Sequence, residues 1–359
     1  DQAIEIVFDV EAPILAARIA TGTPAGQALP PMIMHLATTR GTNALLEEKG
    51  AEVTLFITRG FEDLLVIGDQ KRPDLFALNV QKQAPLTANA VGIDERLDAL
   101  GQILRPLNLP QPNPPKNENQ SAAVVCLHSH RNPEHEQRLA KHLHDAGWKH
   151  VSVSSDLAAV IKVLPRAETT VVDAYLSPIM TRYLEGVERE LASGKLHVMT
   201  SAGGLVSHAD YRAKDSLLSG PAGGVVGAAM VGRQTGFERI IGFDMGGTST
   251  DVCLFDGDFD YKYEHRVGRA RVIAPVLAIE TVAAGGGSIC GFNGDELFVG
   301  PESAGANPGP ACYGAGGPLT ITDVNLLLGR LDPAQFGIPV KIDAAQYALD
   351  QVRQSIPEP

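Results

Sequence analysis

Glycine is unevenly distributed along this chain, and that distribution constrains the fold more than any other feature. Twenty-four of the 37 glycines lie between Gly203 and Gly317, in about a third of the 359 residues. No collagen-like period accompanies them and apolar segments flank them, so they do not mark a disordered linker. Because glycine has no Cβ, it allows tight turns and close approach of the backbone to a ligand. We therefore expect several tight turns between buried segments.

The composition excludes several classes of protein. Hydrophobic residues make up 44% and charged residues 20%, which is typical of a globular chain with a sizeable core. The net charge of −12, without a run of five like charges, predicts no nucleic-acid partner. No apolar run approaches 18 residues, which predicts no membrane partner.

The length predicts about two domains. The four cysteines form no CxxC pair, so we expect packed thiols in a cytoplasmic protein; they are Cys126, Cys253, Cys290 and Cys312.

Apolar segments and helical patterns alternate along the chain, which predicts an α/β fold with a mostly parallel sheet and ligands at the strand ends. The expected strands are 32–39, 52–58, 122–128, 150–155 and 196–201. The expected helices are 43–50 with Gly50 as its C-terminal cap, 133–146, 168–191 with a bend at Pro178, and 221–235. Five prolines and four asparagines in 106–120 predict a surface linker. The Arg72-Pro73 step predicts extended backbone.

The most specific segment is FDMGGTSTDV, from Phe243 to Val252. It predicts strand, tight glycine turn and strand over 239–255, with the turn at Gly246 and Gly247. Without Cβ atoms these glycines let a phosphate reach the backbone N–H groups. Three hydroxyl groups follow, on Thr248, Ser249 and Thr250. The two flanking carboxylates, Asp244 and Asp251, are candidate ligands for Mg²⁺. An ordinary β-hairpin whose glycines only serve the turn is the alternative interpretation.

Three further glycine clusters lie near this segment in the sequence. They are SAGGL (201–205), SGPAGGVVGA (219–228), which opens a helix and so suits an anion, and AAGGGSI (283–289). Four glycine turns at the ends of elements predict a backbone-lined anion pocket. The segment 299–317 is also rich in glycine, and a compact loop with purely structural glycines is the alternative there.

Eight segments together resemble the hydantoinase A / 5-oxoprolinase family, nearest to its 5-oxoprolinase-like branch. They follow the family's order and cover nearly the whole chain: GTNALLEEKGA, TRGFEDLL, TTVVDAYLSP, SGPAGGVVGA, GFDMGGTSTDV, TVAAGGGSI, VGPESAGANPGPACYG and TDVNLLLGRLDP. The resemblance implies an actin/sugar-kinase/Hsp70-like ATPase core with mixed sheets flanked by helices. It also implies the cofactors ATP and Mg²⁺.

The activity implied by the resemblance is ATP-dependent hydrolysis of a cyclic amide, above all of 5-oxoproline to glutamate. A nucleotide-binding subunit of an acetone-type carboxylase and an ATP-dependent N-methylhydantoinase are alternatives. The expected partners are the small cyclic amide, a hydantoinase B-type region or subunit, and further copies in an oligomer.

The resemblance also implies roles for particular residues. Asp244, Asp251 and Thr248 would be catalytic, with both aspartates on the metal, and the turn from Gly246 to Thr250 would bind phosphate. The nucleotide or its cleft would be lined by Gly203, Gly204, Gly220, Gly223, Gly224, Gly285, Gly286 and Gly287. The polar turn TTRGTN would touch substrate or γ-phosphate through Thr38, Thr39, Arg40 and Asn43. The alternatives are a capped turn without a ligand and, for Arg40, a surface charge.

The chain departs from the family pattern in several places. The family's N-terminal GGTFTD hairpin and its C-terminal part are absent, so we expect this chain to be the middle of a larger ATPase; a catalytically incomplete fragment is a further alternative. Ala37, Ala202 and Glu280 stand where glycine, asparagine and histidine are expected. The expected regions are 1–165 (partial N-terminal region), 166–345 (hydantoinase A-type domain) and 346–359 (C-terminal tail).

Six of the ten histidines fall between His128 and His150. His135 and His142 share a face of the predicted helix, but His144 does not, so the spacing does not favour one metal site. We expect structural or solvated roles, with a metal cluster as the alternative.

Overall fold

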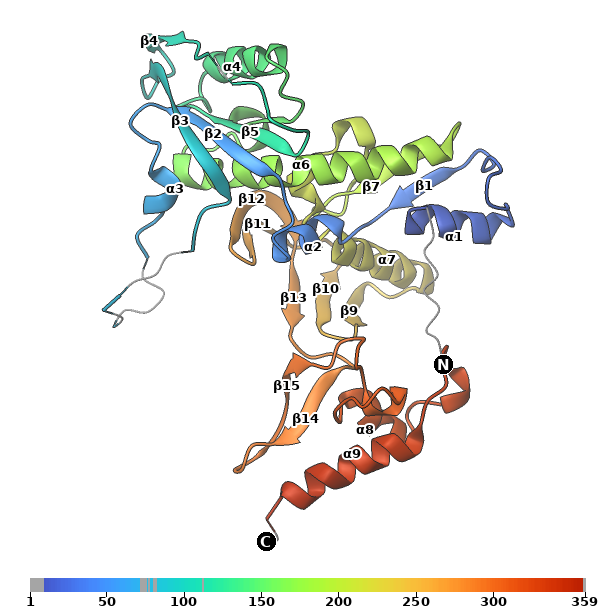
Figure 1. The fold of residues 1–359 in the computed structure, drawn as a ribbon. Helices are drawn as coiled ribbons and strands as arrows, with labels where there is room; N and C mark the ends of the chain where they lie inside the picture. Colours follow the sequence, from blue (N-terminus) through green and yellow to red (C-terminus); the bar gives the residue numbers. More distant parts are fainter. Residues whose placement is uncertain (1–9, 72–75, 77, 80–82, 112, 358–359) are drawn as a thin grey trace. The chain divides into compact units, whose positions relative to one another are not determined.

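The computed structural model describes residues 10–71, 76, 78–79, 83–111 and 113–357 (Figure 1). The chain divides into two compact units. The first consists of Asp1–Gly223 and Tyr261–Leu277, and the second of Gly224–Asp260 and Ala278–Pro359. Helix α7 (Ser219–Thr235) begins in the first unit and ends in the second.

The main sheet of the first unit is parallel except at one edge. Strand β2 pairs in parallel with β3 and β5, β5 pairs in parallel with β6, and β4 pairs antiparallel with β3. The order across the sheet is β4 (Ile103–Asn108), β3 (Thr87–Leu97), β2 (Glu52–Thr58), β5 (Gln120–Val125), β6 (Val151–Val153).

Both faces of this sheet are covered, which explains its apolar strands. All six residues of β5 are buried, as expected for a central parallel strand. One face carries Leu55 and Val125 into the larger core, where α6 (Val163–Leu191) contributes Val171 and Leu176. The other face packs Phe56 against Leu139 of α4 (Glu134–Asp145) and against Trp148. Figure 1 shows α6 running along the sheet.

The rest of the first unit surrounds α6. A three-stranded sheet has the order β1 (Ile33–Leu36), β7 (Lys195–Met199), β8 (Leu205–Ser207), with β1 and β7 parallel and β8 antiparallel. The hairpin of β11 (Tyr261–Val267) and β12 (Ala270–Leu277) packs Val272 and Ala274 into the same core. The short helices are α1 (Ala12–Thr21), α2 (Arg40–Leu46), α3 (Leu64–Ile67), α5 (Ser154–Leu157), η1 (His208–Asp210) and η2 (Ala213–Ser216).

The second unit is built from antiparallel strands. Strand β10 (Thr250–Asp256) lies between β9 (Arg239–Met245) and β13 (Ile279–Val282), and β14 (Ser288–Phe292) pairs with β15 (Leu297–Ser303). A small core of Cys312, Leu326 and Ala345 holds the remaining helices together. These are η3 (Ala311–Tyr313), α8 (Ile321–Leu327), η4 (Pro333–Gln335) and α9 (Ile342–Ser355).

Most of the predicted elements are present, with shifted ends. The mostly parallel sheet is confirmed for 52–153 but is wrong for 239–303, where every strand pair is antiparallel. The helix predicted to have Gly50 as its C-terminal cap ends at Leu46 with Glu47 as the cap, and Glu48 takes the positive φ of 56°. Gly50 instead allows close packing, because a Cβ there would overlap the ring of Tyr175.

Other differences concern extended segments. The predicted strand 150–155 is limited to 151–153 because α5 follows at once, and the long helix begins five residues earlier than expected. The segment predicted as a linker, 106–120, begins inside β4 and ends at the first residue of β5. The segment 299–317 begins inside β15. The Arg72-Pro73 prediction lies outside the described residues. The division at residue 165 falls within α6 and stays a prediction.

No helix in the described ranges is long and apolar enough to cross a membrane.

Candidate functional site

The predicted strand, turn and strand of 239–255 form an antiparallel hairpin in the second unit. Asp244 pairs with Asp251 in the register of β9 and β10, and the Gly246 N–H donates to the Ser249 carbonyl at 2.9 Å to close the turn. Side chains of directly paired residues lie on the same face of a sheet. The hairpin therefore places the two carboxylates side by side, next to the glycine turn.

The neighbouring strand extends this row of oxygen atoms. Thr281 of β13 pairs with Asp251 of β10, and its hydroxyl donates to the Asp251 carboxylate at 2.6 Å. This bond fixes one carboxylate, whereas Asp244 is exposed. Carboxylate oxygens completed by waters are the ligands that Mg²⁺ prefers. The paired carboxylates of Asp244 and Asp251 therefore fit a magnesium ion.

The 285–287 loop packs directly on the hairpin turn, backbone against backbone. Gly286 N–H donates to the Gly246 carbonyl at 2.9 Å, and Gly287 N–H donates to the Gly247 carbonyl at 2.7 Å. A Cβ on Gly285 would lie 2.6 Å from the carbonyl carbon of Gly247 and from the nitrogen of Thr248. Only glycine fits this approach, so two of the predicted glycine clusters form one structure.

The outer side of the turn is open. A Cβ on Gly247 would meet nothing within 4 Å, and the nearest atom to one on Gly246 would be the Ser249 carbonyl oxygen at 3.5 Å. Thr248 is exposed and Ser249 half-buried. Backbone without side chains beside the hydroxyl groups of Thr248 and Ser249 fits an anion such as phosphate. Thr250 differs, because its buried hydroxyl donates to the Ala284 carbonyl.

Two further hydroxyl groups contact the glycine loops, and sequence reasoning missed both. Ser303 donates to the Gly247 carbonyl at 3.3 Å, and Thr322, in the first turn of α8, donates to the Gly286 carbonyl at 2.9 Å. Ser303 lies within the segment VGPESAGANPGPACYG and Thr322 begins TDVNLLLGRLDP, but nothing in either segment indicates the contact. Ser303 therefore supports the hairpin turn, and Thr322 supports the 285–287 loop.

A second group of predicted residues comes together in the first unit. The Ser219 hydroxyl donates to the Thr38 carbonyl at 2.9 Å, and the Leu218 N–H donates to the Thr42 hydroxyl at 3.2 Å. Gly41 allows α2 to approach η2, since a Cβ there would overlap Ser216. The polar turn is therefore held against the start of α7.

Glycines at the start of α7 face the same turn. A Cβ on Gly220 would lie 3.1 Å from the Thr39 methyl group, and one on Gly223 would lie 3.3 Å from the Cβ of Ala37. At Gly224 there is open space. Thr39 and Asn43 are exposed.

Arg40 has partners of its own in this turn. Its guanidinium forms an ion pair with Glu11 at 3.0 Å and lies over the Tyr183 ring, 4.7 Å from the centroid. Burial raises the pKa of Tyr183, so this ring stays neutral. A role of Arg40 in anion binding stays a prediction.

Gly203 and Gly204 form the tight turn between β7 and β8. Gly203 has a φ of 78°, and its N–H donates to the Thr200 carbonyl at 2.9 Å. The Thr200 N–H donates back to the Gly204 carbonyl at 2.8 Å. These contacts lie within the turn itself, and the predicted nucleotide contact of the two glycines stays a prediction.

Comparison with known proteins identifies the family. Residues 166–357 match the sequence profile of hydantoinase/oxoprolinase, and residues 27–147 match that of the hydantoinase/oxoprolinase N-terminal region. The chain belongs to the hydantoinase/oxoprolinase family. Among its relatives, 5-oxoprolinase PfmaA of Pestalotiopsis fici is 42% identical over 338 residues, which cover 84% of this chain and 26% of PfmaA. The chain thus spans about a quarter of the length of this curated relative.

Two solved structures have a fold similar to that of this chain. The ATP-dependent caprolactamase from Pseudomonas jessenii superposes with a TM-score of 0.73 and 30% identity, covering 95% of this chain and 53% of that one. Nucleotide-free acetone carboxylase superposes with a TM-score of 0.66 and 25% identity, covering 89% and 49%. The α/β, actin-like ATPase fold class with mixed sheets and flanking helices is thereby confirmed.

The histidine-rich segment of this family member has structural partners. His135 bonds Glu95 at 2.8 Å, while the rings of His142 and His144 bond the carbonyls of Pro110 and Trp148, each at 2.8 Å. Among the described residues, no group of three or more histidine, cysteine or acidic side chains is arranged to hold a metal. The cysteines are free thiols, of which Cys290 alone is only half-buried.

Proposed function

We propose that this chain binds ATP and Mg²⁺ at the β9–β10 hairpin and is part of an ATP-dependent hydrolase of cyclic amides, acting on 5-oxoproline to give glutamate. The observation that carries the proposal is the open glycine turn flanked by two paired carboxylates. The names of the relatives support it, since one is a 5-oxoprolinase and another an ATP-dependent caprolactamase.

In this proposal the hairpin backbone positions the phosphates. Gly246 and Gly247 leave the backbone of the turn without side chains in the way, and Thr248 and Ser249 add hydroxyl donors. The Gly246 N–H itself closes the turn on the Ser249 carbonyl. Fixed donors of this kind act on charge as it develops, without having to reorganise. Gly286 and Gly287 hold the turn in place through the hydrogen bonds described above, Gly285 packs closely against its backbone, and Thr250 supports it through Ala284.

Asp244 and Asp251 are the proposed ligands of the metal. When bound, Mg²⁺ would neutralise charge on the phosphate oxygens. Asp251 would be held in one orientation by Thr281, leaving Asp244 free to contact the ion or the attacking water. Thr248 would lie nearest the phosphate.

The chemistry of a lactam explains why ATP is needed. A cyclic amide is resonance-stabilised and a poor electrophile, so water attacks it slowly. Transfer of the γ-phosphoryl group to the lactam oxygen would make the ring carbon a better electrophile. Attack of water on that carbon and cleavage of the C–N bond, with the nitrogen taking up a proton, would then leave an acyl phosphate, which a second water would hydrolyse to the carboxylate and inorganic phosphate. The route requires positioning and charge neutralisation, and it requires no nucleophilic serine or cysteine.

We propose Thr38, Thr39, Arg40 and Asn43 as substrate contacts. Arg40 is the candidate for the carboxylate of 5-oxoproline, because its planar guanidinium can make two parallel hydrogen bonds. Its ion pair with Glu11 would then be exchanged for one with substrate. Gly203, Gly204, Gly220, Gly223 and Gly224 stay proposed as lining the nucleotide. The hydantoinase B-type partner, an oligomer and the cytoplasmic location also stay predictions.

The direct test is ATP hydrolysis by the full-length protein, with and without 5-oxoproline and hydantoins. The proposal predicts Mg²⁺-dependent turnover that 5-oxoproline stimulates, with glutamate and phosphate formed in equal amounts. If no cyclic amide stimulates turnover, the proposed hydrolase activity is wrong.

A second candidate is the nucleotide-binding subunit of a carboxylase that activates a ketone or bicarbonate by phosphorylation. The similarity to acetone carboxylase favours it. The same assay separates the two, because this candidate predicts stimulation by acetone with bicarbonate and none by 5-oxoproline.

A further inference from the structure

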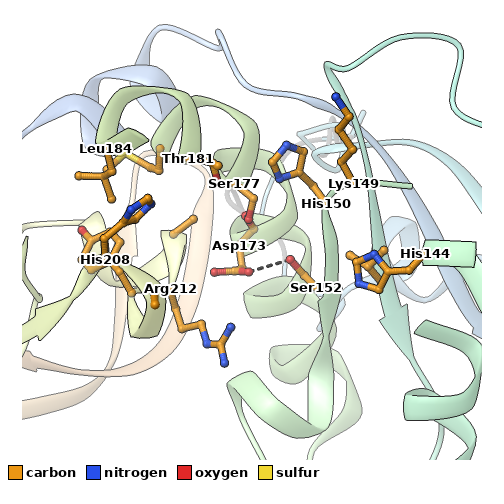
Figure 2. A pocket seen from close by; sticks show the side chains of 15 residues that line it. His144, Lys149, His150, Ser152, Asp173, Ser177, Thr181, Leu184, His208 and Arg212 are labelled. Carbon is orange, nitrogen blue, oxygen red and sulfur yellow. Dashed lines mark hydrogen bonds between the residues drawn. The ribbon is translucent and has the colours of Figure 1, made fainter. Parts of the chain in front are cut away.

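A cavity of about 300 Å³ lies within the first unit, formed by residues from four segments. His144 belongs to α4, residues 149–152 lead into β6, Asp173 to Leu184 belong to α6, and 208–213 follow β8. Figure 2 shows this cavity from close by. Its volume is at the small end of the range for ligand pockets, which suits a molecule about the size of an amino acid.

A buried carboxylate lines this cavity. Asp173 is 5% exposed; its two oxygens accept from the Ser152 hydroxyl at 2.7 Å and from the Lys214 N–H at 2.9 Å. The Lys214 ammonium bonds Asp215 instead, at 2.6 Å. No ion pair of Asp173 within 4 Å exists in the part of the chain that the structure describes. Burial raises the pKa of this carboxyl because it destabilises the charged form. A hydrogen-bond donor or cation from a ligand would stabilise that charged form.

Basic side chains occupy other positions around the cavity. They are Lys149, His150, His208 and Arg212. Lys149 is paired with Glu118, and His208 with Glu188 at 2.9 Å. Arg212 is exposed, and no side-chain hydrogen bond or ion pair of Arg212 is found within the described residues. Figure 2 shows the Asp173 carboxylate bonded to Ser152, with Arg212, His208 and His150 as separate side chains around the same cavity.

Opposite charges in one small cavity select the kind of ligand. Arg212 offers a planar pair of donors that matches a carboxylate, and Asp173 offers an acceptor. A simple anion such as phosphate would meet the Asp173 carboxylate without a donor to satisfy it, which costs binding energy. The walls include the apolar side chains of Met180 and Leu184, which suit the carbon chain of a ligand.

We propose that this cavity binds a small amino acid, with its carboxylate on Arg212 and its ammonium group on Asp173. The inference stands apart from the proposed function, because it uses none of the hairpin residues and needs no ATP.

The test is calorimetry of the full-length protein, without ATP, with three probes. L-Glutamate and glutarate differ only by the amine, and inorganic phosphate is an anion without a carbon chain. We expect L-glutamate to bind at least about tenfold more tightly than glutarate, since only it gives Asp173 a charged donor. Phosphate should bind more weakly than either. Equal affinity for L-glutamate and glutarate, tightest binding of phosphate, or no binding of L-glutamate at millimolar concentration would overturn the proposal.

Two variants place the binding in this cavity. Arg212→Gln should weaken L-glutamate binding about tenfold or more, because a charge-assisted pair is lost. Arg189→Gln, at an exposed arginine of α6 outside the cavity, should leave the affinity unchanged. Asp173→Asn should remove the preference for L-glutamate over glutarate, a ratio measured on the same folded sample. Unchanged affinity in Arg212→Gln would contradict the proposal, and Arg212 is exposed, so this variant has no buried contact to lose.

Discussion

The two units differ in how far their strands are buried. Strand β5 of the first unit is buried along all six residues, between α6 on one face and α4 on the other. Strand β9 of the second unit is mostly exposed, with Ile241 at 70% and Phe243 at 67% exposure. Leu254 of β10, at 60%, is exposed as well. The first unit gains stability from side chains, whereas the hairpin of the second depends on its backbone contacts.

This difference predicts which substitutions destabilise each unit. Removing methyl groups should harm the first unit, where apolar area is buried. Adding a methyl group should harm the second, where the 285–287 loop touches the hairpin turn backbone to backbone. The candidate nucleotide site thus depends on glycines that have no Cβ, whereas the core of the first unit depends on buried methyl groups.

The largest expected effect compares one leucine in each unit. Leu55→Ala, at a side chain 1% exposed on β2, should lower the free energy of unfolding by about 2–5 kcal/mol. Leu254→Ala removes the same atoms from an exposed position and should change it by less than about 0.5 kcal/mol. Urea unfolding followed by far-UV circular dichroism reports both units and measures the two losses. Trp148, the single tryptophan, packs on Phe56, and its fluorescence identifies the transition of the first unit. Equal losses in both variants would break the comparison.

The next effect adds one methyl group to the second unit. Gly285→Ala should destabilise the hairpin by about 1–3 kcal/mol, because the new Cβ meets backbone that cannot move aside. Gly227→Ala is the control in α7, where a Cβ has open space and alanine favours the helix by about 1 kcal/mol. Hydrogen exchange of peptides covering 240–256, followed by mass spectrometry, measures both. The prediction is wrong if Gly285→Ala leaves exchange in these peptides unchanged.

The smallest expected effect uses pH. All ten histidines lie in the first unit. Burial lowers the pKa of His150, against the opposing influence of Glu185 and Glu118 and together with Lys149 and Arg182. The stability from its neutral ring is fully present above the unfolded pKa of about 6.5 and is lost as pH falls through the lower folded value.

Acidification from pH 7 to pH 5 should therefore weaken the first unit, and His150→Gln should make the decline shallower. Urea unfolding followed by Trp148 fluorescence at several pH values measures this. A steeper decline in His150→Gln would contradict the sign of the shift.

The sequence predicted strands with a clear apolar pattern and missed two hairpins that lack one. The strand predicted at 52–58 has the same bounds in the structure, and the one predicted at 122–128 lies at 120–125. The β3–β4 hairpin was missed because 87–108 mixes polar and apolar residues and because Pro106, inside β4, was assigned to the linker. The β14–β15 hairpin was missed because its glycines indicated loops.

The candidate site was predictable where one motif contains it. The segment 243–252 holds both carboxylates and the turn, so its register follows from the turn itself. Thr281, Ser303 and Thr322 come from three other segments. Only the folded structure shows that the Thr281 hydroxyl bonds Asp251 and that the hydroxyls of Ser303 and Thr322 bond the glycine loops. Likewise, the cavity around Asp173 joins residues 149–152 and 208–213, which share no motif.

The most direct test of the account compares two aspartates of the hairpin. Asp244 faces Asp251 beside the glycine turn, whereas Asp256, at the far end of β10, is paired with Arg239 at 2.8 Å. In the full-length protein, Asp244→Asn should lower the kcat of Mg²⁺-dependent ATP hydrolysis by about 100-fold or more, the effect of losing one preorganised charge-stabilising group. Asp256→Asn should stay within about twofold of the unaltered protein, since an exposed ion pair contributes little. Unchanged turnover in Asp244→Asn would contradict the claim that this hairpin is the nucleotide site.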